Sequence, residues 1–308
     1  MNNVYVRGNT SIKSISLTRL FLLLPLIIYG VYKNGIFLYM NKYVNLFDMF
    51  RPIILILIGG LIGALVNIIY EKIIRRRKEN IITTIFSSFH IEYGIILACI
   101  SSVSTNAFAF TICTFFILLI SKFLNNRVNI VCISFIVIYL IMSLKGNYVF
   151  ANAYELSKNF SLNLMDYLTG RAPGGIAATH VILLLVALCG LHISNTNKSE
   201  ITIYACISYS IPAILYAIIS HISVLEVLFL NNYMFVFTFV ATDSVTSSYT
   251  NNGKKVFGIL VGLLTFGFYL VNPILAPFIS IAIVSLLNNL IDRKVGMFNQ
   301  NNSKLKGE

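Results

Sequence analysis

Residues 52–70 read PIILILIGGLIGALVNIIY, an apolar run without a charged residue. A helix of this length crosses the hydrocarbon core of a bilayer, which is about 30 Å thick, because it rises about 1.5 Å per residue. The whole chain is similar: 57% of its 308 residues are apolar and 11% are charged, whereas soluble domains carry roughly 25% charged residues. The composition excludes a soluble globular domain and predicts an all-α polytopic membrane protein.

Ten apolar runs are long enough to be membrane spans, and each is expected to form one transmembrane helix. The expected spans are 20–40, 52–70, 85–102, 107–122, 128–144, 178–194, 201–219, 224–241, 256–271 and 273–291. Lys33 and Asn34 interrupt the first run, and Glu226 lies near the start of the eighth. An even number of spans places both termini on the same side of the membrane.

The lysines and arginines report the orientation of the chain. The formal net charge is +12, but we interpret it as orientation in a lipid bilayer and expect no nucleic-acid partner. With the N-terminus inside, 17 of the 23 basic residues fall on the inner side and 6 on the outer side. Because basic residues concentrate on the cytoplasmic side, we expect a multi-pass protein of the cytoplasmic membrane with both termini in the cytoplasm. The run Arg75–Lys78 is interpreted as a topology anchor and not as a lipid-specific site.

The expected layout has five segments. They are a cytoplasmic N-terminal segment (1–19), a first membrane repeat (20–144), an extracytoplasmic loop (145–177), a second membrane repeat (178–291) and a cytoplasmic tail (292–308). No removable signal peptide is expected, because residues 1–18 are polar and no small-residue cleavage site follows the first apolar run. The five cysteines show no CxxC pairing, so neither a disulfide framework nor a metal site is predicted.

Two polar clusters resemble each other, and each ends an apolar run. The first is ACISSVST at 98–105, and the second is VATDSVTS at 240–247. They end the third and the eighth expected spans, which are five spans apart. Because five is odd, the two copies face opposite sides of the membrane, which predicts ten transmembrane helices arranged as two inverted five-helix repeats.

The candidate site consists of the polar members of these two clusters. They are Ser101, Ser102, Ser104 and Thr105 in the first cluster and Thr242, Asp243, Ser244, Thr246 and Ser247 in the second. Inverted repeats place broken helices near a central path, where such residues line an ion, substrate or flavin site. The alternative is that the hydroxyls only cap their own helices. Asp243 favours function, because a carboxylate close to hydrocarbon is costly unless it is paired or functional. The repeat also predicts that the two clusters approach each other.

Other polar residues and motifs have simpler interpretations. Glu92 and His90 are interpreted as interfacial residues beside the cytoplasmic loop, the alternative being a proton relay or a cation site. His180 is interpreted as an outer-interface histidine that water satisfies. The GxxxG motifs at 59–63 and 258–262 predict close helix packing without a ligand. No P-loop, Ser/His/Asp grouping or metal-ligand spacing is present, which argues against a self-contained enzyme of the soluble type.

The second cluster belongs to a longer pattern that resembles a known family. The matching residues are Ala241–Ser247, Thr250, Asn251, Gly253, the run Val256–Val271 and Leu290–Arg293, with a second match at Met165, Asp166, Gly170 and Pro173–Ile176. Together they resemble the NqrB/RnfD family, whose members belong to the sodium-pumping NADH:quinone oxidoreductase and to the RNF electron-transport complex. The resemblance covers residues 85–295, and its most specific part is Ala241–Asp243.

The resemblance implies an integral membrane component of an ion-motive electron-transport complex. It implies ten helices in two inverted repeats, a flavin, and a position on the route that couples redox chemistry to cation movement. The implied partners are the other membrane subunits of an RNF-like complex. The implied chain is a non-autonomous part of an ion-translocating oxidoreductase, and whether it is itself an enzyme is left open.

The sequence departs from the family at the flavin. The family's covalent acceptor is a threonine in a Ser/Thr-Gly-Ala-Thr motif on the outer loop, and residues 143–163 contain no such motif. The nearest likeness is Thr169–Ala172, which has Ala172 where the acceptor hydroxyl would be. We therefore expect no covalent FMN. Noncovalent FMN or riboflavin, held by the polar clusters and aromatic residues, stays open, although no dinucleotide fingerprint supports it.

Two functions of different classes fit these observations. The first is a membrane subunit of an RNF-like ion-translocating electron-transport complex that contributes a cation path and a noncovalent flavin. The second is a stand-alone transporter or channel for flavin or another small solute on the same scaffold. A purely structural remnant is a third interpretation.

Overall fold

The structure is a computed structural model, and its described part is helical. It describes residues 11–76, 78, 80–123, 128–144, 146, 162–194 and 198–305, with side chains placed as far as 295. Within these residues every regular element is a helix and none is a strand, so the predicted all-α class is confirmed. Much of the expected outer loop 145–177, including Lys158, lies outside the described residues.

The first helix is longer than expected. α1 (Ile12–Val31) continues through a π-helical segment, η1 (Tyr32–Ile36), into α2 (Phe37–Met40). Its start is fixed by Ser11, whose side chain accepts a hydrogen bond of 3.1 Å from the backbone N–H of Ser14. The helix therefore begins ahead of residue 20, and Arg19 lies inside it.

Most of the other helices overlap expected apolar runs. In the first half they are α3 (Leu46–Met49), α4 (Arg51–Ile68) with η2 (Ile69–Ile74), α5 (Ile81–Ile85), α6 (His90–Ile100), α7 (Ala107–Ser121) and α8 (Ile130–Ser143). In the second half they are α9 (Leu164–Leu168), α10 (Val181–Ile193), α11 (Ser199–Ile219), α12 (Val224–Phe229), α13 (Tyr233–Phe235) with η3 (Val236–Val240), α14 (Asn251–Tyr269) and α15 (Ala276–Leu305). The short helices α3, α5 and α9 lie almost entirely between the expected runs.

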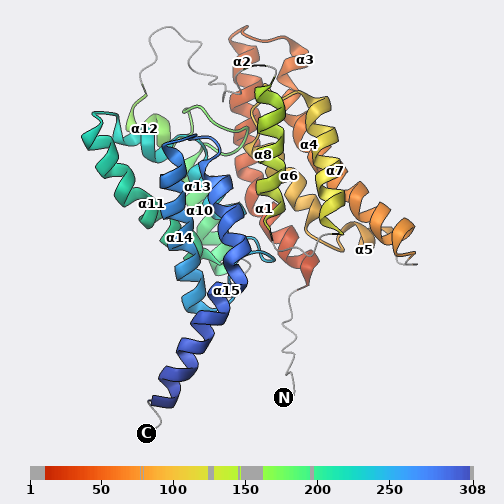
Figure 1. The fold of residues 1–308 in the computed structure, drawn as a ribbon. Helices are drawn as coiled ribbons and strands as arrows, with labels where there is room; N and C mark the ends of the chain where they lie inside the picture. Colours follow the sequence, from red (N-terminus) through yellow and green to blue (C-terminus); the bar gives the residue numbers. More distant parts are fainter. Residues whose placement is uncertain are drawn as a thin grey trace.

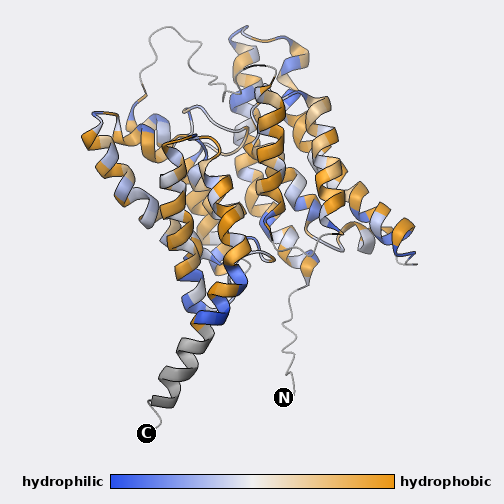
Figure 2. Cartoon of the chain, in the orientation of Figure 1, coloured by the Kyte–Doolittle hydropathy of each residue, from blue (hydrophilic) through white to orange (hydrophobic). Residues whose placement is uncertain are grey.

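Length and composition make several of these helices suitable for a bilayer. Three described helices are long and apolar enough to cross one, namely Ile12–Met40, Arg51–Ile74 and Ser199–Ile219. Figure 2 shows apolar residues along the middle of the helices and hydrophilic residues gathered at their two ends. This distribution is that of a helical membrane protein.

The eighth expected span is broken into two short helices, and the third expected span holds only α6, which follows a break after α5. The first break separates α5 from α6 at 86–89, and the second separates α12 from α13 at 230–232. At the second break Asn231 and Asn232 have φ of 62° and 64°, a left-handed conformation that interrupts a helix. Because α6 has only 11 residues, it is about 16 Å long and does not cross the hydrocarbon core alone. The sequence predicts a single uninterrupted helix for each of these two runs, whereas in the structure the eighth run holds two helices and the third a shorter one.

The two halves of the chain pack through corresponding helices. α1 contacts α10, α6 contacts η3, and α8 contacts α15, so each pair joins elements that are five spans apart in the expected order. In Figure 1 the helices α1–α8 lie on one side of the molecule and α11–α15 on the other. The described chain begins and ends at the same, lower end of this view.

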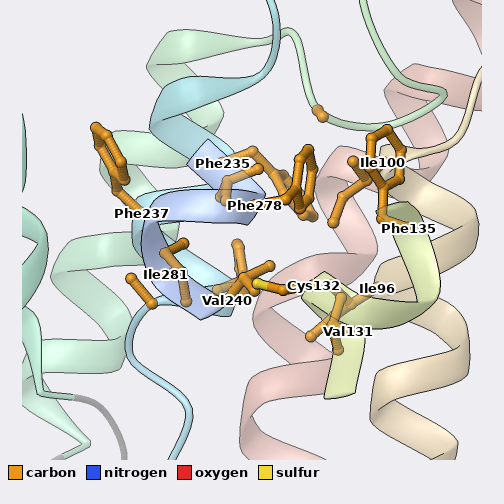
Figure 3. Packing of buried hydrophobic residues seen from close by; sticks show 14 of the residues in the cluster. Ile96, Ile100, Val131, Cys132, Phe135, Phe235, Phe237, Val240, Phe278 and Ile281 are labelled. Atoms are coloured by element: carbon orange, nitrogen blue, oxygen red, sulfur yellow. The ribbon is translucent and has the colours of Figure 1, made fainter. Parts of the chain in front are cut away.

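The core lies where the two halves meet. Figure 3 shows Phe135 of α8 beside Phe278 of α15, and their rings stack with centroids 4.0 Å apart at 21°. Ile100 of α6 and Val240 of η3 are buried next to them. The packed apolar core therefore holds both broken helices against α8 and α15.

Glycines allow the tightest helix contact. A Cβ at Gly59 of α4 would lie 2.2 Å from the carbonyl oxygen of Gly94 in α6, and one at Gly63 would lie 2.3 Å from that of His90. A Cβ at Gly262 of α14 would lie 2.4 Å from the carbonyl oxygen of Ala205 in α11. The close packing predicted from both GxxxG motifs is confirmed.

Candidate functional site

The second polar cluster forms a buried turn between η3 and α14. Asp243 is 3% exposed, and its Oδ2 accepts hydrogen bonds from the Thr246 backbone N–H at 3.1 Å and from the Thr246 hydroxyl at 2.8 Å. Ser247 donates to the Asp243 carbonyl at 2.5 Å, and Thr242 donates to the Thr238 carbonyl at 2.5 Å. These hydroxyls bond to their own backbone, which agrees in part with the alternative that they only cap their helices.

Asp243 also reaches the first half of the chain. The Tyr93 hydroxyl of α6 donates a hydrogen bond of 2.8 Å to Asp243 Oδ1. Asn129, which caps α8, donates from Nδ2 to the Val240 carbonyl at 2.9 Å and to the Thr246 hydroxyl at 3.3 Å. The Asp243 carboxylate is thus held by donors from two parts of the chain that are far apart in sequence.

A buried ion pair lies beside this carboxylate. Arg19 Nε of α1 is 2.9 Å from Glu92 Oε1 of α6, and both side chains are 1% exposed. Arg19 Nη2 donates to the Phe239 carbonyl of η3 at 2.5 Å. Glu92 is also close enough to Asp243 for their charges to repel each other. Ser16 of α1 also lies close enough to interact with the Glu92 carboxylate.

The structure corrects the interpretation of Glu92 and His90. Both are expected at the interface beside the cytoplasmic loop, but they are 1% and 3% exposed and lie inside the protein. His90 lies between two serines, with Nδ1 2.8 Å from Ser88 Oγ and Nε2 2.9 Å from Ser121 Oγ. The reason is the break before α6, which lets the start of this helix lie inside the protein.

Lys198 lies at the open edge of the second cluster, just before α11. Its Nζ donates to the Ser247 carbonyl at 2.8 Å and to the Ser247 hydroxyl at 2.9 Å. It also lies 3.8 Å from the centre of the Tyr249 ring. Burial lowers the pKa of Lys198 to about 8, and the carboxylates of Asp243 and Asp292 oppose this by favouring the charged ammonium.

The first polar cluster meets the segment that follows α9. The Ser101 carbonyl accepts from the Ile176 N–H at 3.0 Å, and the Ser101 hydroxyl donates to the Leu97 carbonyl at 2.8 Å. Ser102 Oγ and Ser104 Oγ are 2.9 Å apart. Arg51 donates to the carbonyls of Ser104 and Thr105 at 3.3 and 3.4 Å. Serine and threonine here satisfy backbone groups at the end of α6.

The hydrogen bonds do not bring the two clusters together. Asn232, at the start of α13, donates to the Ile100 carbonyl at 3.4 Å and accepts from the Gly175 N–H at 2.9 Å. The end of α6 therefore meets the start of α13, while the start of α6, at Tyr93, meets the turn after η3. The two broken helices cross in opposite directions, so each cluster contacts the start of the other helix. The expectation that the clusters approach each other is not met in the described residues.

Lys33 and Asn34 bind the segment 170–180. Lys33 is 0% exposed, and its Nζ donates to the Ala172 carbonyl at 2.5 Å and to the Thr179 hydroxyl at 3.2 Å. Asn34 Nδ2 donates to the Ile176 carbonyl at 3.0 Å. The polar pair does not end the first helix, because the π-helical turn η1 accommodates it.

His180 also has protein partners. Its Nδ1 accepts from the Leu183 N–H at 3.3 Å, which caps α10, and its ring meets Tyr29 edge-on at 4.5 Å. The interpretation of His180 as an outer-interface histidine that water satisfies stays a prediction.

Comparison with known proteins agrees with this architecture. A model of the NQR2, RnfD, RnfE family matches residues 1–299.

The chain belongs to the NQR2, RnfD, RnfE family.

One curated relative matches a shorter part of this chain at low identity. The NqrB protein of the Na(+)-translocating NADH-quinone reductase of Chromohalobacter salexigens is 29% identical over 126 residues, which are 39% of this chain and 31% of the relative. The match thus spans about a third of the relative's length.

Two parts of this chain bear on flavin binding, namely the loop at 169–172 and a pocket beside α11. Ala172 has no hydroxyl to carry a phosphoester, and the Thr169 hydroxyl donates to the Met165 carbonyl at 2.7 Å. A partly open pocket of about 120 Å³ lies between α11, α12 and α13–η3. It is lined by Cys206, Tyr209, Ser210, Leu228, Phe229, Tyr233, Met234 and Phe237. Its walls are aromatic, but its volume is below the roughly 300–1,000 Å³ of ligand pockets, and no residue of either polar cluster lines it.

Sequence reasoning misses three residues around Asp243. It assigns Arg19 to the N-terminal segment and Glu92 to the interface, and it gives Tyr93 no role. Arg19 and Glu92 carry a usable signal, since charged residues next to apolar runs are functional candidates by default. Tyr93 carries none, because its role follows from the crossing of α6 and η3.

Proposed function

We propose that this chain is the membrane subunit of an RNF-like ion-translocating electron-transport complex and contributes the path of a cation through it. The observation that carries the proposal is the pair of buried carboxylates, Glu92 and Asp243, where α6 meets the turn after η3. Membership of the NQR2, RnfD, RnfE family supports the complex. The cation is the cargo of the complex and not a resident metal, and no metal-ligand cluster occurs in the described residues.

The broken helices supply the electrostatics of such a path. Carbonyl groups at the end of a helix carry partial negative charge, and η3 ends beside both carboxylates. Arg19 and Asn129 satisfy the Phe239 and Val240 carbonyls. Arg19 cancels the charge of Glu92, while Asp243 has only neutral hydrogen-bond donors in direct contact. Asp243 is therefore the residue that a passing monovalent cation neutralises.

The remaining assignments extend this proposal. Ten spans in two inverted five-helix repeats are supported by the pairing of α1 with α10, α6 with η3 and α8 with α15. A cytoplasmic location of both termini is supported by the basic residues and by the common end of the described chain (Figure 1). The partners are other membrane subunits of the complex. FMN or riboflavin is held without a covalent bond, which the missing hydroxyl at Ala172 supports; when bound, it would supply electron transfer.

The test replaces Asp243 by Asn, which keeps the shape and removes the charge. The complex with its partner subunits is reconstituted in liposomes, and sodium uptake driven by electron transfer is measured. We expect uptake to fall by about tenfold or more, which corresponds to about 1.4 kcal/mol, with unchanged membrane insertion. The matched control is Glu226→Gln, which neutralises an exposed carboxylate. Equal uptake in Asp243→Asn contradicts the proposal, and uptake by the chain alone, without partners, supports a stand-alone transporter.

A further inference from the structure

The Lys198 ammonium is bound as a free cation would be. Its contacts include a carbonyl oxygen and a hydroxyl oxygen of Ser247, at 2.8 and 2.9 Å, and the face of the Tyr249 ring at 3.8 Å. Carbonyl and hydroxyl oxygens replace the hydration shell of monovalent cations in selective sites, and an aromatic face attracts cations of any kind. The side chain of Lys198 therefore fills a position whose chemistry suits a monovalent cation.

This position lies at the edge of the protein, beside Asp243. Lys198 is half-buried and Tyr249 is 63% exposed, whereas Asp243 behind them is 3% exposed. The turn that carries both oxygens is anchored, because Tyr249 donates from its hydroxyl to the Ser244 carbonyl at 2.7 Å and from its N–H to Asp292 Oδ2 at 3.2 Å. A cation that approaches Asp243 from this edge meets the Lys198 ammonium.

Both carboxylates and cations surround the Lys198 ammonium. The charged groups that act on it are Asp243, Asp292, Lys254 and Arg19. Arg19 is committed to Glu92, and Asp292 is held by the hydroxyls of Ser248 and Thr250. The charges of Asp243 and Asp292 both favour the Lys198 ammonium, so moving that ammonium away removes one positive charge from beside the two carboxylates.

We propose that Lys198 is a tethered cation that occupies the edge of the Asp243 site, and that one free monovalent cation takes its place when the path is loaded. The proposal rests on the cation path proposed above. The flexible four-carbon stem of lysine permits such a movement, and a monovalent cation restores the single positive charge that the ammonium supplied. Lys198 thus competes with the cargo and keeps the path closed in its absence.

The first test measures cation binding by the purified full chain in detergent. Thermal stability is followed while NaCl replaces choline chloride at constant ionic strength, since a ligand that binds the folded state raises the melting temperature. Because a charge a few Å away is removed, Lys198→Gln is expected to lower the half-saturating sodium concentration by about tenfold or more. Lys198→Arg keeps the charge and is expected to stay within about threefold of the wild type. Lys294→Gln, which removes an exposed charge from α15, is the matched control.

The second test uses the unmodified chain and does not depend on the folding of a variant. Lysines are acylated with a water-soluble amine reagent in NaCl or in choline chloride, and the modification of each is quantified by peptide mass spectrometry. If sodium displaces the Lys198 ammonium, sodium increases labelling of Lys198 by about threefold or more and leaves Lys294 unchanged.

The outcomes separate the two proposals. If sodium stabilises the wild type but Lys198→Gln shows the same half-saturation, or Lys198 labelling ignores sodium, the tethered-cation role is wrong and the cation path stands. If sodium stabilises neither the wild type nor Lys198→Gln, the cation path itself is contradicted.

Discussion

Tyr93 and Asp243, which are 150 positions apart, are joined by a hydrogen bond of 2.8 Å from the Tyr93 hydroxyl to Asp243 Oδ1. The bond links the start of α6 in the first half of the chain to the turn after η3 in the second half. Both groups are buried, and a hydrogen bond to a charged group contributes more than one between neutral groups.

Removing the Tyr93 hydroxyl tests how much its hydrogen bond to Asp243 stabilises the protein. Tyr93→Phe is expected to lower the free energy of unfolding by about 1.5–3 kcal/mol, because a buried carboxylate loses a donor. Tyr209→Phe is the matched control, since its hydroxyl donates to the neutral Val227 carbonyl at 2.7 Å and its loss should cost about 0.5–1.5 kcal/mol. Thermal unfolding of both variants in detergent gives the comparison, and equal losses would refute the charge-assisted role.

The Arg19–Glu92 pair is expected to behave as a unit. Arg19→Gln and Glu92→Gln each leave an unpaired buried charge, so each single variant should lose about 3–5 kcal/mol. The double variant leaves no charge and should recover most of this loss. The free energy of unfolding is measured for the wild type, the two single variants and the double variant. Additive losses would show that the two side chains act independently.

Gly59 should not tolerate a methyl group. In Gly59→Ala the Cβ would lie 2.2 Å from the Gly94 carbonyl oxygen, whereas in Gly60→Ala the nearest atom is a side-chain carbon of Ile95 at 3.4 Å. We expect Gly59→Ala to separate α4 from α6 and to lower the melting temperature by several degrees or more, about 1–3 kcal/mol for overpacking. Gly60→Ala should match the wild type, and similar melting of the two variants would contradict the α4–α6 contact.

The chain is expected to carry no covalent FMN. After coexpression with a flavin transferase, the denatured polypeptide should show no ultraviolet fluorescence in a gel, because Ala172 offers no hydroxyl. The double variant Arg171→Ala with Ala172→Thr restores a Thr-Gly-Ala-Thr sequence and should become fluorescent if the loop is accessible to the transferase. A fluorescent band from the unaltered chain that maps to Thr169 would overturn this alignment.

Orientation is tested by labelling from outside the cell. An engineered cysteine near Lys158 should react with a membrane-impermeant thiol reagent, and one near Arg76 should be protected, because basic residues concentrate on the cytoplasmic side. Reversed labelling would show that the chain has the opposite orientation to the one expected.

The class of the protein and the places of its helices follow from the amino-acid sequence alone. Apolar runs such as 52–70 have only one stable backbone arrangement in a bilayer, so composition and run length suffice. The two polar clusters are also visible there, because Asp243 beside hydrocarbon is costly without a role. Both GxxxG motifs predict the close packing correctly, since a glycine spacing is a local property of one helix.

The surroundings of Asp243, in contrast, depend on how distant segments pack. The sequence predicts that the two clusters approach each other. In the structure each cluster instead lies by the start of the other broken helix. Tyr93, Glu92 and Arg19 reach Asp243 because α1, α6 and η3 cross there, and a crossing depends on contacts between segments far apart in the chain. The periodicity of one sequence does not predict this crossing, because the partner of each side chain lies on another helix.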